Sequence, residues 1–213
     1  GKVILNQDGS AEHMSWTSNA VKIYAKWEAF QDAEGLAELP VHYSWGVGWN
    51  QQGFQLQELT EVGTALSANA NFDLQHAHTY YVTVQAVNCA GLYSSQYSTW
   101  MYVDLTAPVF DYIYIYHNNA SSFDATIVRD GTLTVAFQAH DFESPVEYFS
   151  VTGLYDGNNG KPPLLRDNNL SNEFGKIHKF TYEVADFDDS NGYRFTASCT
   201  NLAGLTQEIT TEV

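Results

Sequence analysis

Carboxylates recur at matching places in the two halves of this 213-residue chain. Asp32 and Glu34 are separated by one residue, Asp141 and Glu143 repeat this spacing, and Asp104 lies between the two pairs in the sequence. Calcium takes about six to eight oxygen ligands, which carboxylates and backbone carbonyls supply. We therefore predict a calcium site formed by Asp104, Asp141 and Glu143. The alternative is that these carboxylates only accept hydrogen bonds from backbone N–H groups in turns.

The elements that would position these side chains repeat along the chain. Residues 80–92 and 193–205 both alternate apolar and polar side chains and then reach Asn-x-Ala-Gly-Leu, 113 residues apart. Alternation with period two is typical of a half-buried strand that ends in a turn. The offset suits a sandwich domain of about 100 residues and is too long for a solenoid repeat. The sequence therefore predicts two domains, residues 1–107 and 108–213.

Further strands are expected from the same alternation. Residues 21–27 place Val21, Ile23, Ala25 and Trp27 on one face, which predicts that all four face a core. The other expected strands are 3–5, 41–47, 54–59, 64–72, 97–103, 112–116, 132–137, 148–151 and 176–184. By the same period, Cys199 faces a core, whereas Cys89 lies at a strand end. We expect both thiols to be free, or Cys89 to pair outside this segment.

Several motifs resemble fibronectin type III-like repeats of large extracellular mosaic proteins. In such repeats a Trp closes the second strand, here Trp27, and a Leu stands six residues before a Tyr that begins Tyr-x-x-x-Val-x-Ala, here Leu74 and Tyr80. The resemblance is looser in residues 109–213, where Phe137 replaces the Trp and Phe187 the Leu. The narrower motifs are Trp27-x-x-Phe30-x-Asp32-x-Glu34, Tyr43-x-Trp45-x-Val47-Gly48, Asn88-x-Ala90-Gly91-Leu92 and Val103-Asp104-x-Thr106-x-Pro108.

The resemblance implies an all-β fold of two fibronectin type III-like antiparallel β-sandwiches in tandem, in an extracellular or cell-surface protein. It also implies that the Tyr80 hydroxyl reaches back to the backbone. In such a sandwich, the loop after the second strand lies where the chain enters the domain. Asp104 would then lie near Asp141 and Glu143, and calcium there would stiffen a short linker that ends in Pro108.

The charge of the chain limits its partners. The formal net charge is -16, with three basic against ten acidic residues in 1–107 and six against fifteen in 108–213. Nucleic acids and anionic membranes are therefore excluded as expected partners. No stretch is apolar enough to span a membrane or to act as a signal peptide, so we expect a mature segment of a longer protein.

The remaining candidate residues are surface features. Asn119 and Asn169 fit the N-glycosylation motif, which has chemical meaning on a secreted eukaryotic chain. We interpret Asp186, Asp188 and Asp189 as a polar turn, and a metal site is the alternative. No catalytic motif is present, which predicts no catalytic residues, no enzyme activity and no cofactor other than calcium.

Four aromatic residues are candidates for contact with a partner. Trp49, Tyr93, Tyr97 and Trp100 either form a protein or glycan contact surface or cover the edges of the sandwich. We predict a non-enzymatic structural and adhesive repeat segment, acting as a semi-rigid rod and as a protein-interaction module, including contacts with copies of itself in a fibre. The alternative function is a carbohydrate-binding accessory module of a secreted or surface protein.

Overall fold

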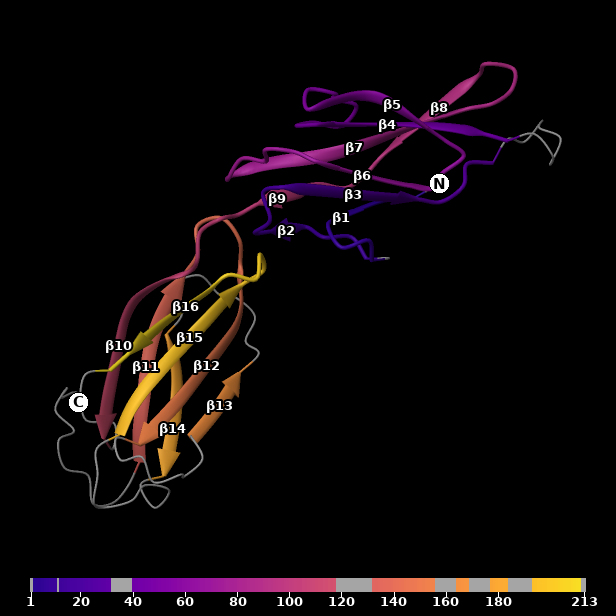
Figure 1. The fold of residues 1–213 in the computed structure, drawn as a ribbon. Helices are drawn as coiled ribbons and strands as arrows, with labels where there is room; N and C mark the ends of the chain where they lie inside the picture. Colours follow the sequence, from indigo (N-terminus) through magenta and orange to yellow (C-terminus); the bar gives the residue numbers. More distant parts are fainter. Residues whose placement is uncertain are drawn as a thin grey trace. The chain divides into compact units, whose positions relative to one another are not determined.

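The computed structural model describes residues 2–10, 12–31, 40–117, 132–155, 164–168, 177–183 and 193–211. The chain divides into two compact units, Gly1–Leu105 and Thr106–Val213, so this boundary lies two residues before the expected one. Every regular element of the described residues is a β-strand (Figure 1), which confirms the all-β prediction. None of these residues belongs to a helix that could cross a membrane.

The first unit is a sandwich of a three-stranded and a six-stranded sheet. The smaller sheet has the order β1 (Val3–Asn6), β3 (Lys22–Trp27), β6 (Ser67–Asn71). The larger has the order β2 (Trp16–Thr17), β9 (Met101–Val103), β7 (His78–Val87), β4 (His42–Gly48), β5 (Gln57–Gly63), and β8 (Tyr93–Tyr97) also pairs with β7. Its pairings are antiparallel except for β2 with β9, which is parallel.

The core of the first unit lies between these sheets, where alternate residues of each strand point inward. Trp27 and Trp45 are both buried, as predicted from their motifs. Tyr80 is also buried, and its hydroxyl accepts a hydrogen bond from the Gln75 backbone N–H at 2.7 Å. The expected contact between this hydroxyl and the backbone is therefore confirmed.

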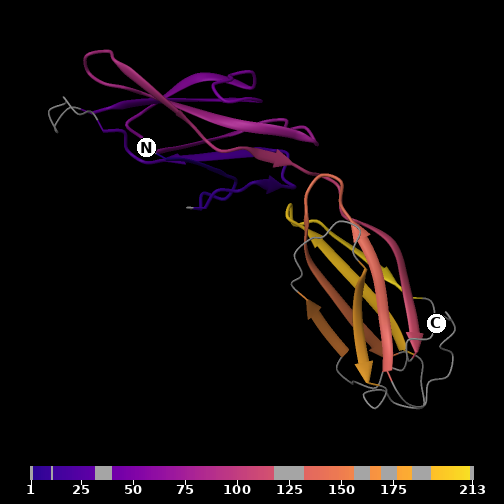
Figure 2. The same ribbon diagram turned by 180° about the vertical axis from the view of Figure 1, so that it is seen from behind.

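The second unit has the same two-layer construction (Figure 2). One sheet has the order β10 (Val109–His117), β11 (Thr132–His140), β14 (His178–Glu183), and the other has the order β13 (Leu164–Asn168), β12 (Val146–Tyr155), β15 (Tyr193–Asn201), β16 (Thr206–Thr210). Phe137 is buried in the place predicted for it. The buried His178 ring lies 4.0 Å from the Phe149 ring and 5.6 Å from the Phe137 ring, measured between ring centroids.

The structure corrects several strand predictions, and it adds β13 and β16, which were not among the expected strands. Val21 is 57% exposed, because β3 begins at Lys22 and the inward alternation does not yet apply to Val21. Trp16 and Thr17 form the parallel strand β2, which was not among the expected strands. Of the single strand expected over 97–103, only Tyr97, the last residue of β8, and the three residues of β9 are in strands.

Ser98 follows the last residue of β8 directly. Its N–H donates to the Val82 carbonyl at 2.9 Å, while its own hydroxyl accepts from the Val82 N–H at 3.0 Å in place of a backbone carbonyl. Thr211 makes the same two bonds with Phe195 in the second unit, at 2.9 and 3.0 Å. The pair Val82 and Ser98 thus corresponds to the pair Phe195 and Thr211 at the 113-residue offset. The repeat therefore extends to individual hydrogen bonds.

The Asn-x-Ala-Gly-Leu turns also match. In each, the Asn and Leu backbones bond to each other, the Gly N–H donates to the Asn carbonyl, and the Asn Oδ1 atom accepts from the Leu N–H. Gly91 and Gly204 have φ angles of 78° and 80°, a conformation that side chains with a Cβ rarely adopt. The geometry therefore explains why glycine stands at this point of both turns.

Candidate functional site

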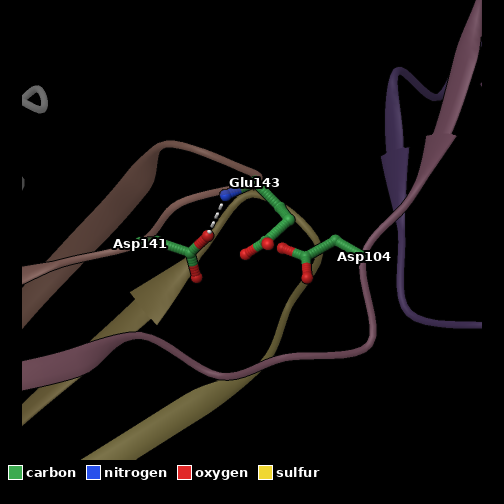
Figure 3. Close-up of side chains that lie close together, drawn as sticks. All are labelled: Asp104, Asp141 and Glu143. Carbon is green, nitrogen blue, oxygen red and sulfur yellow. Dashed lines mark hydrogen bonds between the residues drawn. The ribbon is translucent and has the colours of Figure 1, made fainter. Parts of the chain in front are cut away.

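The loop after β11 holds two of the three predicted calcium ligands. Asp141 follows β11 directly and is only 9% exposed, and Glu143 lies two residues later. The Asp141 Oδ1 atom accepts hydrogen bonds from the backbone N–H groups of Glu143 and Ser144, both at 2.9 Å, and Figure 3 shows the first of them. This pattern is typical of an aspartate that stabilises a turn, which supports the alternative interpretation of Asp141.

Asn201, the last residue of β15, provides the other partner of Asp141. Its fully buried side chain donates from Nδ2 to Asp141 Oδ2 at 2.9 Å and to the Thr106 carbonyl at 3.0 Å. Its Oδ1 atom accepts from the Leu205 N–H at 2.9 Å. A buried donor or acceptor that loses its hydrogen-bond partner lowers the free energy of unfolding by about 1–3 kcal/mol. These bonds therefore hold the Asn201 side chain in this orientation.

Thr106 is the first residue of the second unit, and its hydroxyl donates to Glu143 Oε2 at 3.0 Å. We call Thr106, Asp141, Glu143 and Asn201 the Asn201 cluster. It joins the start of the second unit to the loop after β11 and to the end of β15. The repeat motif marks Asn201 in the sequence, but nothing there indicates that its amide contacts Thr106 and Asp141, so this cluster was not predicted.

Asp104, the third predicted ligand, follows β9 in the first unit. It is fully buried, and its N–H donates to the Thr17 carbonyl at 2.9 Å. Its Oδ1 atom lies 3.9 Å from His76 Nδ1. That nitrogen accepts a hydrogen bond from the Leu105 N–H at 3.0 Å.

The covalent chain limits how far Asp104 can lie from the Asn201 cluster. Consecutive Cα atoms are about 3.8 Å apart, so the Cα atoms of Asp104 and Thr106 stay within about 7.6 Å of each other. Asp104 belongs to the first unit, whereas Asp141 and Glu143 belong to the second, and Figure 3 labels all three. Their carboxylate oxygens are the ligand type that calcium prefers, and the calcium site stays a prediction.

The four candidate contact aromatics are all on the surface. Tyr93 is 72% exposed, Trp49 53%, Tyr97 41% and Trp100 38%. Trp100 also packs edge to face against Trp16, with ring centroids 4.9 Å apart. The other predicted residues, Asn119, Asn169, Asp32, Glu34, Asp186, Asp188, Asp189 and Phe187, lie outside the described residues.

No protein-family model matches this chain, and no curated protein matches it. Among solved structures, it is similar to the FN1-FN3 domains of chicken CNTN1, with 14% sequence identity and a TM-score of 0.42 over 99% of this chain and 66% of that one. The chain thus spans slightly less than two thirds of that structure. It is also similar to the fibronectin(III)-like modules of Clostridium thermocellum CbhA, with 13% identity and a TM-score of 0.47 over 97% of this chain and 91% of that one. Both are fibronectin type III structures, the family that the sequence motifs resemble, and at these identities the likeness concerns the fold alone.

Proposed function

We propose that this chain is a non-enzymatic pair of fibronectin type III-like modules that acts as a semi-rigid spacer and protein-interaction segment of an extracellular or cell-surface protein. The observation that carries the proposal is the Asn201 cluster. It fixes Thr106 through both its hydroxyl and its carbonyl, in the segment that leads from one unit to the next. Pro108 restricts the same segment further, because its ring fixes φ.

A distance measurement between the units tests the spacer role. Cys89 is exposed and Cys199 is buried, so spin labels attach at Cys89 and at a second site created by Glu208→Cys on β16. We expect a narrow distance distribution that broadens in Asn201→Ala, which loses the bond from Asn201 Nδ2 to the Thr106 carbonyl. Asn88→Ala is the matched control, because it removes the corresponding turn acceptor of the first unit and leaves the partners of Thr106 in place. Equal, broad distributions in all three proteins would contradict the proposal.

Calcium is proposed as an additional brace at Asp104, Asp141 and Glu143. An ion that binds only the folded protein raises the melting temperature, and the rise grows with the logarithm of the ion concentration. Glu143→Gln is the informative variant, because its amide oxygen still accepts from Thr106 while the charge is removed. We expect calcium to raise the melting temperature of the wild type and to have little effect on this variant. If calcium changes neither protein, the carboxylates serve the turn alone.

The exposed aromatic residues also favour a second candidate function in carbohydrate binding. Aromatic faces on a protein surface offer the amphipathic contact that both sugars and proteins use. A glycan array probed with the wild type and with a Trp49→Ala, Trp100→Ala double variant distinguishes the two uses. Binding that disappears in the variant would support the carbohydrate module.

A further inference from the structure

The border of the six-stranded sheet is protected unevenly. At β9 it is covered by β2, through the parallel pairs Trp16 with Tyr102 and Thr17 with Val103. The opposite border, β5, carries the exposed carboxylates Glu58 and Glu61. Charged side chains and covering strands are common ways to prevent a sheet edge from pairing with another chain.

Strand β8, which reads Tyr-Ser-Ser-Gln-Tyr, has neither protection. Among the described residues it pairs with β7 alone. It contains no charged residue and no proline, and four of its five residues are exposed. Such an uncharged edge is a template for another strand.

The hydrogen bonds at its two ends show which backbone groups face outward. The Ser98 N–H donates to the Val82 carbonyl, and the Asn88 N–H donates to the Leu92 carbonyl. The backbone N–H and carbonyl groups of residues 92 and 98 therefore point toward β7. Backbone groups alternate in direction along an antiparallel strand. The N–H and carbonyl groups of Tyr93, Ser95 and Tyr97 therefore point away from β7, toward the open edge.

The side chains of the same three residues share one face of the sheet. Tyr97 lies opposite Thr83, Ser95 opposite Gln85 and Tyr93 opposite Val87. The core residues of β7 are the alternate ones, Tyr80, Val82, Val84 and Ala86. Because directly opposite residues point to the same side, Tyr93, Ser95 and Tyr97 lie on the outer face of the sandwich.

We propose that β8 of one chain pairs antiparallel with β8 of a second copy, about a two-fold axis at Ser95. In this register Ser95 faces Ser95 of the copy, and each Tyr93 faces Tyr97 of the copy. Each facing pair exchanges two backbone hydrogen bonds, and two aromatic pairs form across the junction. The strand is nearly palindromic, so one surface is complementary to itself, which a two-fold interface requires.

The charge of the chain distinguishes a second copy from other occupants. With a net charge of -16 on each chain, two copies repel each other away from β8. Salt screens that repulsion, with a Debye length of about 8 Å at physiological ionic strength, so self-association strengthens as salt increases. A basic peptide on the same edge would instead bind more weakly as salt increases.

This inference rests on the proposed function, since it names the partner of one interaction surface, and its test is independent of the spacer measurement.

In a Cys89→Ser background of the full chain, Ser95→Cys places two thiols in a facing pair. Cα atoms of such a pair are about 5.5 Å apart, within the range of a disulfide. Gln96→Cys is the matched control, because residue 96 points to the other face and is opposite residue 94 of the copy. We expect disulfide-linked dimers to form at least about tenfold faster in Ser95→Cys.

Proline substitution tests the backbone bonds directly. Ser95→Pro removes an N–H that faces away from β7, so the fold tolerates it at an edge, whereas Ser94→Pro removes an N–H that faces β7. We expect sedimentation to show a salt-strengthened dimer of the wild type that Ser95→Pro abolishes with an unchanged unfolding midpoint. Ser94→Pro should lower that midpoint. A chain that stays monomeric up to about 1 mM, a dimer that persists in Ser95→Pro, or equal oxidation rates in the two cysteine variants would overturn the inference. The spacer role would stand in each case, because its test uses Asn201→Ala in a single chain.

Discussion

Two cysteines show how strongly the surroundings of a residue set its chemistry. Cys89 is exposed in a turn, whereas Cys199 is buried in the second core. Burial, and secondarily the negative charge of Asp141, raises the pKa of the Cys199 thiol from 9.0 to about 12. Since the thiolate is the nucleophile, we expect iodoacetamide to modify Cys89 in the folded protein and Cys199 only after unfolding. Equal labelling of both would contradict the burial of Cys199.

The same shift makes the stability of the second unit depend on pH. The unfolded thiol loses its proton at lower pH than the folded one, so the stabilisation is complete below pH 9 and is lost as pH rises through about 12. Differential scanning calorimetry of the wild type and of Cys199→Ala over this range measures the effect. We expect the melting temperature of the second unit to fall more steeply with pH in the wild type than in Cys199→Ala. If the two melting temperatures fall in parallel, ionisation of Cys199 does not cause the pH dependence.

Asp141 is expected to be the most sensitive acidic residue of the second unit. Asp141→Ala leaves two backbone N–H groups and the Asn201 amide without their acceptor, which should lower the free energy of unfolding by about 2–4 kcal/mol. Asp141→Asn keeps an oxygen for the turn but opposes one amide NH₂ to another, so an intermediate loss is expected. Urea denaturation followed by circular dichroism measures both. A loss below about 0.5 kcal/mol in Asp141→Ala would show that water replaces the carboxylate without penalty.

At the scale of whole elements, the tyrosine at the start of β7 anchors the loop before it. Tyr80→Phe removes the acceptor of the Gln75 N–H and keeps the ring in the core, so we expect a loss of about 1–3 kcal/mol from the first unit. Tyr97→Phe, on the surface of β8, is the matched control and should cost almost nothing. Similar stabilities of the two variants in urea would show that the hydroxyl contact is dispensable.

Strands and turns could be predicted from the sequence where they depend on neighbouring residues alone. Alternation predicts β7 and β15 because the period of a strand is visible in its own residues, and the motif glycines predict the turns because the backbone there needs positive φ. The hydroxyl of Ser98, which follows β8, bonds to Val82, sixteen residues earlier. Alternation cannot show such a contact.

The candidate site was predictable in part for the same reason. Carboxylate spacing identified Asp141 and Glu143, and the repeat drew attention to Asn201. The partners of these side chains come from segments far apart in the sequence, such as Asn201 and Thr106, 95 residues apart. Only the packing of the sheets determines which of them meet.

At the scale of the whole molecule, the excess of carboxylates over basic side chains should produce net repulsion in the folded chain. The chain has 25 acidic and 9 basic residues, and histidine is the basic partner in the pairs His42–Glu61 and His140–Asp111. Screening therefore relieves more repulsion than attraction. We expect potassium chloride to raise the unfolding midpoints of both units. A midpoint that falls with salt would indicate stabilising ion pairs of greater weight than those described.

The two cores also differ in their optical properties. All five tryptophans, at positions 16, 27, 45, 49 and 100, belong to the first unit, and the second unit has phenylalanine where the first has Trp27. Intrinsic tryptophan emission of the intact chain thus reports on the first unit alone, without any label. Of these indoles, those of residues 27 and 45 are buried and those of residues 49 and 100 are exposed. A soluble quencher can therefore separate the interior of that unit from its surface in a single titration.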